Sequence, residues 1–197
     1  TTTVIDFAGQ IKGTAIPHAI ESRLEEASGQ CAIDYGLHLS VGDVNRQSLI
    51  DLPQTLDEGI SSYKLFMAYP DAWYSADGQI LQVMQLASET GAMIMMHAEN
   101  GIAIDVLRDQ AIERGKTGSI WHGRTRPPEL ESEAAHRAIQ LAVVAGSPLY
   151  IVHLSSSNAL AEVARARDDG RNIFAETCPQ YLYLSLEEHL DQPGIDG

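Results

Sequence analysis

The chain alternates between two kinds of segment, one apolar and strand-like and one with the spacing of an amphipathic helix. A helix-period segment ends at a glycine, and a β-branched or apolar run follows a few residues later, as in "ILQVMQLASETG" before "AMIMMHAEN". A glycine just past a helix can take the left-handed conformation that ends it. The pattern predicts six strands, each followed by helix before the next. The strands are expected at residues 1–8, 31–41, 61–69, 92–100, 148–156 and 172–179.

The helices between these strands show recognisable start signals. Ser157 and Asp77 are plausible N-caps, and Pro17 fits the first turn of a helix. After the fourth strand we expect an extra helix ending at Gly115, then a long loop, "GKTGSIWHGRTRPPELE", over one end of the fold. The other helices are expected at residues 19–29, 49–59, 80–91, 133–146 and 158–170.

Short apolar strands separated by helices indicate an α/β fold with a parallel sheet. Strands that are apolar on both faces are expected to be covered by helices on both sides. Periodicity alone fits a doubly wound sheet and a (β/α) barrel equally well. The first strand is followed by "DFAGQIKGTA", which is too poor in glycine to be a dinucleotide-binding fingerprint.

Composition and charge narrow the classes of partner. The 197 residues suit one domain, and the formal net charge of −14 argues against nucleic acid or an anionic membrane surface. No apolar run is long enough to span a bilayer. Cys31 and Cys178 form no metal or redox motif, so we expect small buried side chains and a location in the reducing cytoplasm.

Three predicted strands carry a residue that can ligate a metal near their carboxyl ends. These are Lys64 in "YKLFMAY", His97 after "AMIMM" and His153 after "LYIV". Active sites of α/β folds form at this edge of the sheet, and imidazole suits zinc and similar ions. The alternatives are a lysine that reaches out to water and histidines with purely structural roles. His38 also lies near a strand end, and spacing alone does not separate it from the other two.

Two carboxylates follow strand ends as well. Glu99 and Glu176 are placed either to hydrogen-bond a ligand histidine and fix its tautomer or to lie exposed at the mouth of the fold. "HLSSSN" lacks the G-x-S-x-G context of a serine hydrolase. The remaining histidines are expected at the surface or behind the site: His18, His122, His136 and His189.

Five motifs in order along the chain, "KLFMAY", "MMHAENG", "RTRPPE", "YIVHLSS" and "ETCPQYL", resemble those of the hydantoinases and dihydropyrimidinases. These are cyclic-amide hydrolases of the amidohydrolase superfamily. Allantoinases and dihydroorotases share the general layout and stay as alternatives, although Gln180 stands where an allantoinase more often has histidine.

The resemblance implies two divalent metal ions, expected to be zinc, bridged by a lysine whose amine is carboxylated by carbon dioxide. Lys64 matches that lysine, and His97 and His153 match the histidines of the second metal. Tyr69 matches a tyrosine that donates a hydrogen bond to the substrate's developing oxyanion. The implied reaction is metal-assisted opening of hydantoins or dihydropyrimidines to N-carbamoyl amino acids, by a homo-oligomer whose partner is a small cyclic ureide or amide. Trp73 and Tyr74 either shape the substrate pocket or simply pack their loop.

The resemblance also predicts what this chain lacks. The family's first two histidine ligands would lie before Thr1, and its catalytic aspartate on the eighth strand would lie beyond Gly197. We therefore expect residues 1–197 to form a single partial (β/α)-barrel catalytic domain, a TIM-barrel-type fold without its first and eighth strands. Such a central fragment would hold at most one metal loosely and would hydrolyse its substrate poorly. The alternative is a non-catalytic binding or assembly module on the same fold.

Overall fold

The apolar segments form one parallel sheet in the computed structural model, which describes residues 1–191. The last six residues of the predicted domain, 192–197, lie outside this range. Within the described range the six predicted strands are all present, in the order in which they were expected. They are β1 Thr3–Gly9, β2 Asp34–Ser40, β3 Ser62–Phe66, β4 Met93–His97, β5 Leu149–Ile151 and β6 Ile173–Ala175.

The strand order separates the two α/β architectures that the sequence left open. Each strand pairs in parallel with the next one along the chain, from β1 to β6, without a reversal. A doubly wound sheet reverses its strand order at a switch point, whereas the wall of a (β/α) barrel keeps chain order. The described chain is therefore part of a barrel wall, as the family resemblance implied.

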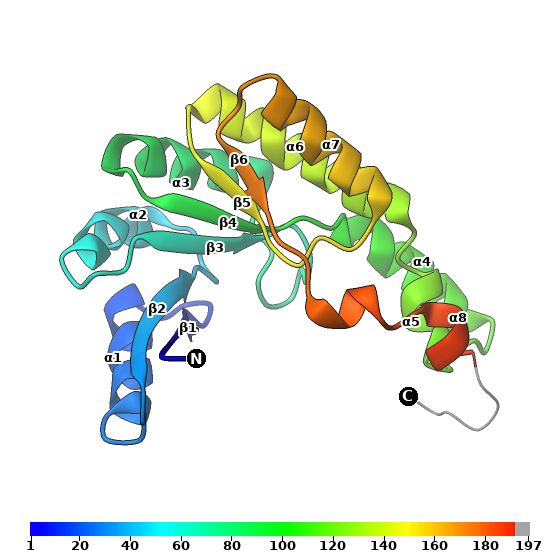
Figure 1. Cartoon of the computed structure of the whole chain (residues 1–197), viewed down its shortest axis with the longest axis horizontal. Coiled ribbons are helices and arrows are strands. Elements are labelled where there is room, and N and C mark those ends of the chain that lie inside the picture. The colour runs from blue at the N-terminus through cyan, green and yellow to red at the C-terminus, as the bar shows by residue number, and fades with distance from the viewer. Residues whose placement is uncertain (192–197) are drawn as a thin grey trace.

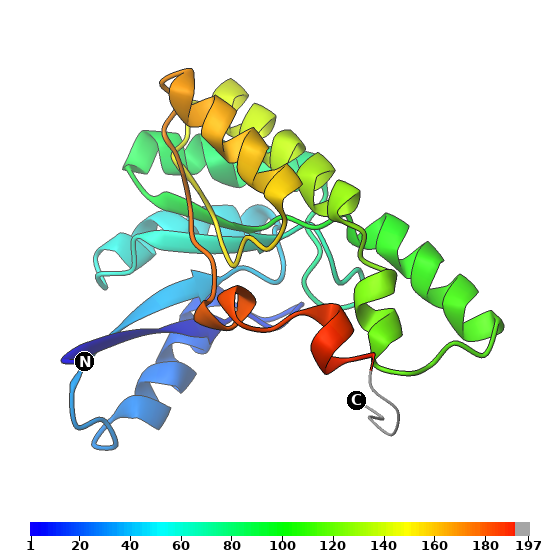
Figure 2. The same cartoon turned by 45° about the vertical axis from the view of Figure 1, so that its right-hand side comes forward.

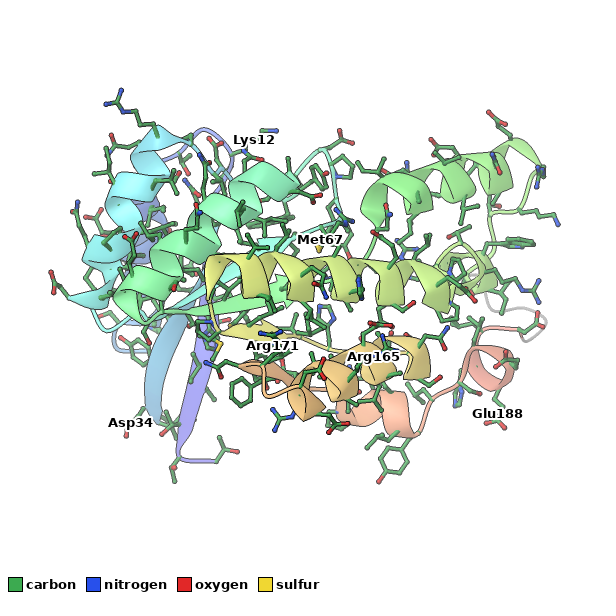
Figure 3. The ribbon with its side chains drawn as sticks, turned by 90° about the horizontal axis from the view of Figure 1, so that it is seen from above. Lys12, Asp34, Met67, Arg165, Arg171 and Glu188 are labelled. Atoms are coloured by element: carbon green, nitrogen blue, oxygen red, sulfur yellow. The ribbon has the colours of Figure 1, made fainter. Side chains whose placement is uncertain are left out.

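The helices form one layer against this sheet. Figure 1 shows α3, α6 and α7 above β3 to β6, with α1 beside β1 and β2. Seen from above in Figure 3, α3, α6 and α7 lie next to one another. The helices are α1 Ile16–Ala27, α2 Arg46–Asp51, α3 Asp77–Thr90, α4 Gly101–Glu113, α5 Ile120–Arg124, α6 Pro128–Ala145, α7 Ser157–Asp168 and α8 Leu186–His189, with short 3₁₀ helices η1 Leu52–Leu56 and η2 Pro179–Leu182.

Alternation along the strands places apolar residues against the helices and the candidate residues on the opposite face. In β3, Tyr63 and Leu65 are fully buried in the core that includes Ile80 of α3. Lys64 and Phe66 point to the other face because successive side chains of a strand alternate. This division makes one side of the sheet a structural core and leaves the other for chemistry.

The expectation of helices on both sheet faces is wrong. The face that carries Lys64 also carries Ile5 and Phe174, whose side chains are 57% and 39% exposed. In a barrel wall the helices cover only the outer face, so strands that are apolar on both sides do not require two helical layers.

Prolines explain two differences in the helix boundaries. The helix predicted over 49–59 is α2 followed by η1, because Pro53 lacks the amide hydrogen that would continue the α-helix. The long loop predicted before residue 133 contains the short helix α5, and α6 begins already at Pro128, which occupies its first turn.

Both predicted N-caps are wrong by one residue. The cap of α7 is Ser156, whose hydroxyl accepts a hydrogen bond from the Ala159 amide, and the cap of α3 is Ala76. Pro17 does lie in the first turn of α1. Gly91 and Gly146 end α3 and α6 in the left-handed conformation, with φ of 79° and 71°.

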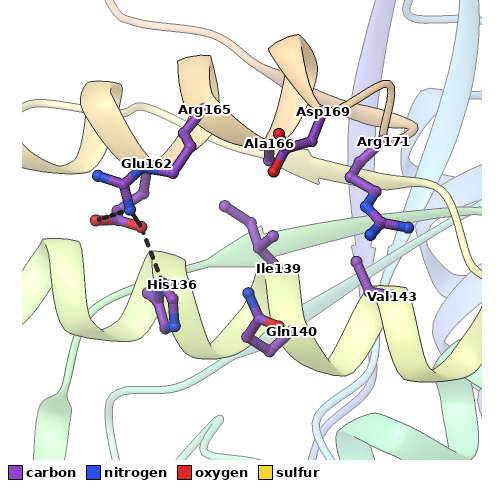
Figure 4. A pocket seen from close by; sticks show the side chains of 9 residues that line it. All are labelled: His136, Ile139, Gln140, Val143, Glu162, Arg165, Ala166, Asp169 and Arg171. Atoms are coloured by element: carbon purple, nitrogen blue, oxygen red, sulfur yellow. Dashed lines mark hydrogen bonds and ion pairs between the residues drawn. The ribbon is translucent and has the colours of Figure 1, made fainter.

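A shallow groove of about 220 Å³ runs between α6 and α7 on the helical layer. Figure 4 shows His136 and Glu162 facing each other across it, with Nδ1 2.9 Å from the carboxylate, and Arg165 beside the same carboxylate. The His136–Glu162 pair joins α6 to α7, whereas the Arg165–Glu162 pair lies within α7, and the candidate site residues lie elsewhere. Among residues 1–191, no helix is both long and apolar enough to cross a membrane.

Candidate active site

The candidate residues meet in a cleft of about 860 Å³ at the carboxyl ends of β3, β4 and β5. Lys64, Tyr69, His97 and His153 all line it. The α5–α6 connection and the segment from η2 to α8 form the rest of its wall, and Figure 2 shows α5 and α8 close together there. The ends of three strands and two further segments of the chain therefore meet at one site.

His97 and His153 face each other directly. His97 is the last residue of β4, and His153 comes two residues after β5, which pairs with β4. His97 Nδ1 lies 3.0 Å from His153 Nε2. Burial, followed by positive charge on His97 and Lys64, lowers the pKa of His153 to about 4, so its imidazole is neutral at pH 7. A neutral imidazole has the lone pair that a metal ligand requires.

Lys64 is partly buried in an unusual setting for a lysine. Its Nζ lies 5.0 Å from the ring centres of both Phe7 and Phe66. Burial lowers the pKa of this amine, whereas negative charge on Glu176 acts in the opposite direction. The interpretation that Lys64 simply reaches out to water does not fit this position between two rings.

Tyr69 is held by a tight turn beyond β3. Its carbonyl accepts hydrogen bonds from the amides of Ala72, Trp73 and Tyr74, at 3.0, 2.9 and 3.1 Å. Its ring centre lies 5.1 Å from that of His97. Burial and then the charge of Glu99 raise the pKa of the phenol, so the hydroxyl keeps its proton at neutral pH and can donate it in a hydrogen bond.

Tyr69 and His153 share a strained backbone. Both lie in the left-handed region, with φ of 63° and 40°, although neither is glycine. Such a conformation costs about 1–3 kcal/mol and persists only where surrounding contacts enforce it. Strain of this kind is concentrated at functional sites, and here it falls on two of the four residues that the sequence analysis selected.

The two carboxylates take different roles. His97 Nε2 donates to Glu99 Oε2 at 3.1 Å, which leaves His97 Nδ1 free to face His153. Burial alone would raise the pKa of Glu99, but the hydrogen bond from His97 and nearby positive charges lower it. Glu176 accepts a hydrogen bond from the Tyr150 hydroxyl at 3.1 Å instead of one from a histidine.

Several other predicted candidates lie outside the cleft. His38 hydrogen-bonds Ser62 on the sheet face, which separates it from His97 and His153. Trp73 packs on Phe66, with ring centres 5.3 Å apart, and lines a different shallow pocket. Its position favours the alternative that it packs its own loop. His18 and His136 are also outside.

Sequence reasoning missed one wall of the cleft. His122 and His189, expected at the surface or behind the site, line the cleft together with Tyr181, Leu184 and Leu186. These residues come from α5, η2, α8 and the link between η2 and α8, short stretches without a clear periodic pattern. Of these residues only Tyr181 lies in the motif "ETCPQYL", and its place beside the histidines depends on the path of the chain after β6.

The cleft gathers basic groups in an acidic chain. Lys64, Arg126 and the four histidines at 97, 122, 153 and 189 line it, although the formal net charge is −14. Glu99 and Glu131 are the acidic residues at its wall. The charge of Arg126 and the hydrogen-bonding nitrogens of the imidazoles suit a polar ligand that carries or develops negative charge.

The paired imidazoles could hold a metal ion. Two nitrogens that bind one zinc at 2.0–2.1 Å lie about 3–3.4 Å apart, close to the 3.0 Å separation of His97 Nδ1 and His153 Nε2. Within residues 1–191, no group of three or more His, Cys, Asp or Glu side chains is placed to hold a metal. A third ligand from this chain would therefore have to be of another kind, and Lys64 lines the same cleft.

Comparison with known proteins agrees with this site. No family model matches the chain. A D-hydantoinase of Streptomyces coelicolor is 53% identical over 197 residues, which is all of this chain and 42% of the relative. The solved D-hydantoinase from Bacillus sp. AR9 matches with a TM-score of 0.97 and 43% identity, over all of this chain and 43% of its own. The dihydropyrimidinase from Brevibacillus agri matches with a TM-score of 0.96 and 42% identity, over all of this chain and 42% of its own.

The chain thus spans about two fifths of the length of these relatives. The match covers all of this chain, and so spans every motif that surrounds the cleft. Together with the chain-ordered parallel strands, it confirms the resemblance of the five motifs. Over its whole length the chain is similar to part of the D-hydantoinases and of a dihydropyrimidinase, which is consistent with a fragment of a hydantoinase-family protein.

Proposed function

We propose that this chain contributes one side of a metal-dependent active site that opens a cyclic ureide, a hydantoin or a dihydropyrimidine, by hydrolysis of a ring amide. The observation that carries the proposal is the 3.0 Å approach of His97 Nδ1 and His153 Nε2 in a cleft that Lys64 and Tyr69 also line. D-hydantoinases and a dihydropyrimidinase with the same fold support this substrate class. All of residues 1–197 would belong to one catalytic barrel domain.

The residues present fit a divalent metal such as zinc. His97 and His153 would hold it through the two facing nitrogens, and a carboxylated Lys64 would add an oxygen ligand. The burial that lowers the pKa of Lys64 favours the neutral amine, which is the form that reacts with carbon dioxide. Bound metal would supply Lewis acidity and an activated water.

The chain's own side chains would orient the ring and stabilise charge. The protonated Tyr69 hydroxyl would donate to the carbonyl oxygen as it gains negative charge, a contact that strengthens towards the transition state. Arg126 would attract the carboxylate that ring opening creates. Leu184 and Leu186 on the opposite wall would face an apolar substituent of the ring.

No observation favours the other readings. A non-catalytic relative would be expected to lose ligand residues, but Lys64, His97 and His153 are all in place at one cleft. The dihydroorotase from Campylobacter jejuni matches with a TM-score of 0.58 at 13% identity, and this supports only the shared fold.

The test is a chimera in which this chain replaces the matching segment of the Streptomyces coelicolor D-hydantoinase. We expect the zinc-loaded chimera to convert hydantoin or dihydrouracil to its N-carbamoyl product. Lys64→Met and His153→Ala should each abolish turnover. His136→Ala, in the groove between α6 and α7, is the control and should retain it.

Circular dichroism and a thermal melt identify the folded variants. A folded, zinc-containing chimera that leaves both rings intact would overturn the proposal. Full turnover by the Lys64→Met chimera would overturn the role of the lysine.

A further inference from the structure

The motif "RTRPPE", residues 124–129, runs from the last residue of α5 into the first turn of α6, and apart from the attraction of Arg126 for the product carboxylate it has no role in the chemistry proposed above. Arg126 and Glu131 are the first and last residues of a short stretch, here called the 126–131 segment, that runs along the cleft. Pro127 and Pro128 fix the backbone in its middle. The Asn100 amide donates to the Leu130 carbonyl at 3.1 Å, which ties the segment to the loop after β4.

One end of the segment reaches His97 through Glu99. Arg126 Nε lies 3.7 Å from Glu99 Oε1, and Glu99 Oε2 accepts from His97 Nε2 at 3.1 Å. The side chains of Arg126 and Glu99 are 23% and 20% exposed, so water screens this pair less than a surface pair. Arg126 also donates to the His122 carbonyl at 2.9 Å, which restricts its guanidinium.

The other end holds the loop that follows His153. Glu131 accepts two hydrogen bonds from Ser155, from its amide at 2.8 Å and from its hydroxyl at 3.1 Å. The Leu154 amide donates to the Glu176 carbonyl at 2.7 Å. These contacts act directly after His153, whose φ of 40° needs support from its surroundings.

We propose that the 126–131 segment positions both metal-binding imidazoles, His97 through Arg126 and Glu99, and His153 through Glu131 and Ser155. The effect on metal binding rests on the proposed function, whereas the contacts that position the imidazoles are formed within the chain itself, without metal. Arg126 keeps Glu99 aimed at His97 Nε2, which holds the proton on that nitrogen and turns Nδ1 towards His153. Glu131 fixes the backbone that turns His153 Nε2 to meet it.

The experiment uses the 197-residue chain labelled with ¹⁵N, with Arg126→Ala and Glu131→Ala as test variants. Arg124→Ala and Glu129→Ala are matched controls, because both side chains are exposed and neither contacts Glu99 or Ser155. Long-range ¹H–¹⁵N spectra of the metal-free chain report the tautomer and surroundings of each imidazole. Zinc affinity is measured separately by competition with a chromophoric chelator, and thermal melts identify folded variants.

We expect Arg126→Ala to move the His97 signals most and Glu131→Ala to move those of His153 most. Each should weaken zinc binding by about tenfold or more, the range found when groups that orient metal ligands are removed. Arg126→Lys and Glu131→Gln should restore part of both effects, and the controls should match the wild type.

The outcomes separate the two proposals. If the imidazole signals respond as expected but the chain binds no zinc, the positioning role of the 126–131 segment is supported and the proposed metal site is contradicted. A wild type that binds zinc, with folded Arg126→Ala and Glu131→Ala variants that change neither the signals nor the affinity, would overturn the positioning role alone.

Discussion

Gly101, the first residue of α4, is packed too closely against the Tyr69 turn to accept a side chain. A Cβ atom there would lie 2.4 Å from Ala68 Cα, 2.8 Å from Ala68 Cβ and 3.1 Å from the Tyr69 amide nitrogen. The Gly101 amide also donates to the Met67 carbonyl at 3.2 Å. Since two of the three close atoms are backbone, Gly101→Ala must displace the turn that carries Tyr69.

The size of the effect follows from two opposing terms. Moving backbone from 2.4 Å to an ordinary contact of about 3.4–4 Å requires a shift of about 1 Å or more, and overpacking of this kind costs about 1–3 kcal/mol. Replacing glycine by alanine in a helix returns at most about 1 kcal/mol, and less at a first residue. We expect Gly101→Ala to lower the free energy of unfolding by about 1–2 kcal/mol.

Urea denaturation measures this difference, and Gly78→Ala is the matched control. Gly78 lies near the start of α3, and a Cβ atom there would meet nothing within 4 Å beyond its chain neighbours and its own helix backbone, so alanine should raise the free energy of unfolding by up to about 1 kcal/mol. If Gly101→Ala proves as stable as Gly78→Ala, the close packing of α4 on the Tyr69 turn is wrong.

Three further predictions concern single side chains. Tyr69→Phe in the chimera should reduce kcat by about 10²–10³ while the melting temperature stays unchanged, because one oxyanion donor is lost; an unchanged kcat would contradict the role of the hydroxyl. Ser156→Ala should destabilise the chain by about 1 kcal/mol in urea denaturation, whereas Ser157→Ala should have little effect, because only Ser156 caps α7; the reverse order would contradict the cap. The hydrogen bond from His136, with Arg165 nearby, lowers the pKa of Glu162 below its usual 4.5. The ionised Glu162 therefore stabilises the folded chain above about pH 4.5, and this contribution is lost as the pH falls through the folded-state pKa. Glu162→Gln should therefore cost up to about 1 kcal/mol at pH 7 and almost nothing at pH 3, compared with Glu129→Gln; equal costs at both pH values would contradict the ion pair.

The fold was predictable because its signals are local and repeated. Glycines such as Gly91 and Gly146 end helices, and apolar runs such as 92–97 mark strands, so element order follows from neighbouring residues. Which sheet face is covered is set by the curvature of the whole wall. Strand periodicity does not contain that information, and the predicted two-sided cover was wrong for this reason.

The core of the candidate site was predictable for a related reason. Parallel strands bring their carboxyl ends to one edge, so Lys64, His97 and His153 could be grouped before their distances were known. Their supports come from elements distant in the sequence. The contact of Glu131 with Ser155 joins α6 to the loop after β5, and no spacing rule connects those two residues.

The left-handed backbone at His153 and Tyr69 was equally hidden from the sequence. Residues other than glycine rarely take positive φ, and no local motif marks either position. The strain results from packing and hydrogen bonds that only the folded chain makes.

Metal binding by the two facing imidazoles tests the account most directly. The measurement is a Co²⁺ titration of the 197-residue chain, followed by its visible absorption, with His97→Ala, His153→Ala and the exposed His136→Ala compared side by side. The account predicts one cobalt per chain with nitrogen ligation, weakened more than tenfold in each of the first two variants and unchanged in the third. Equal cobalt affinity in the wild type and in the folded His97→Ala and His153→Ala variants would contradict it.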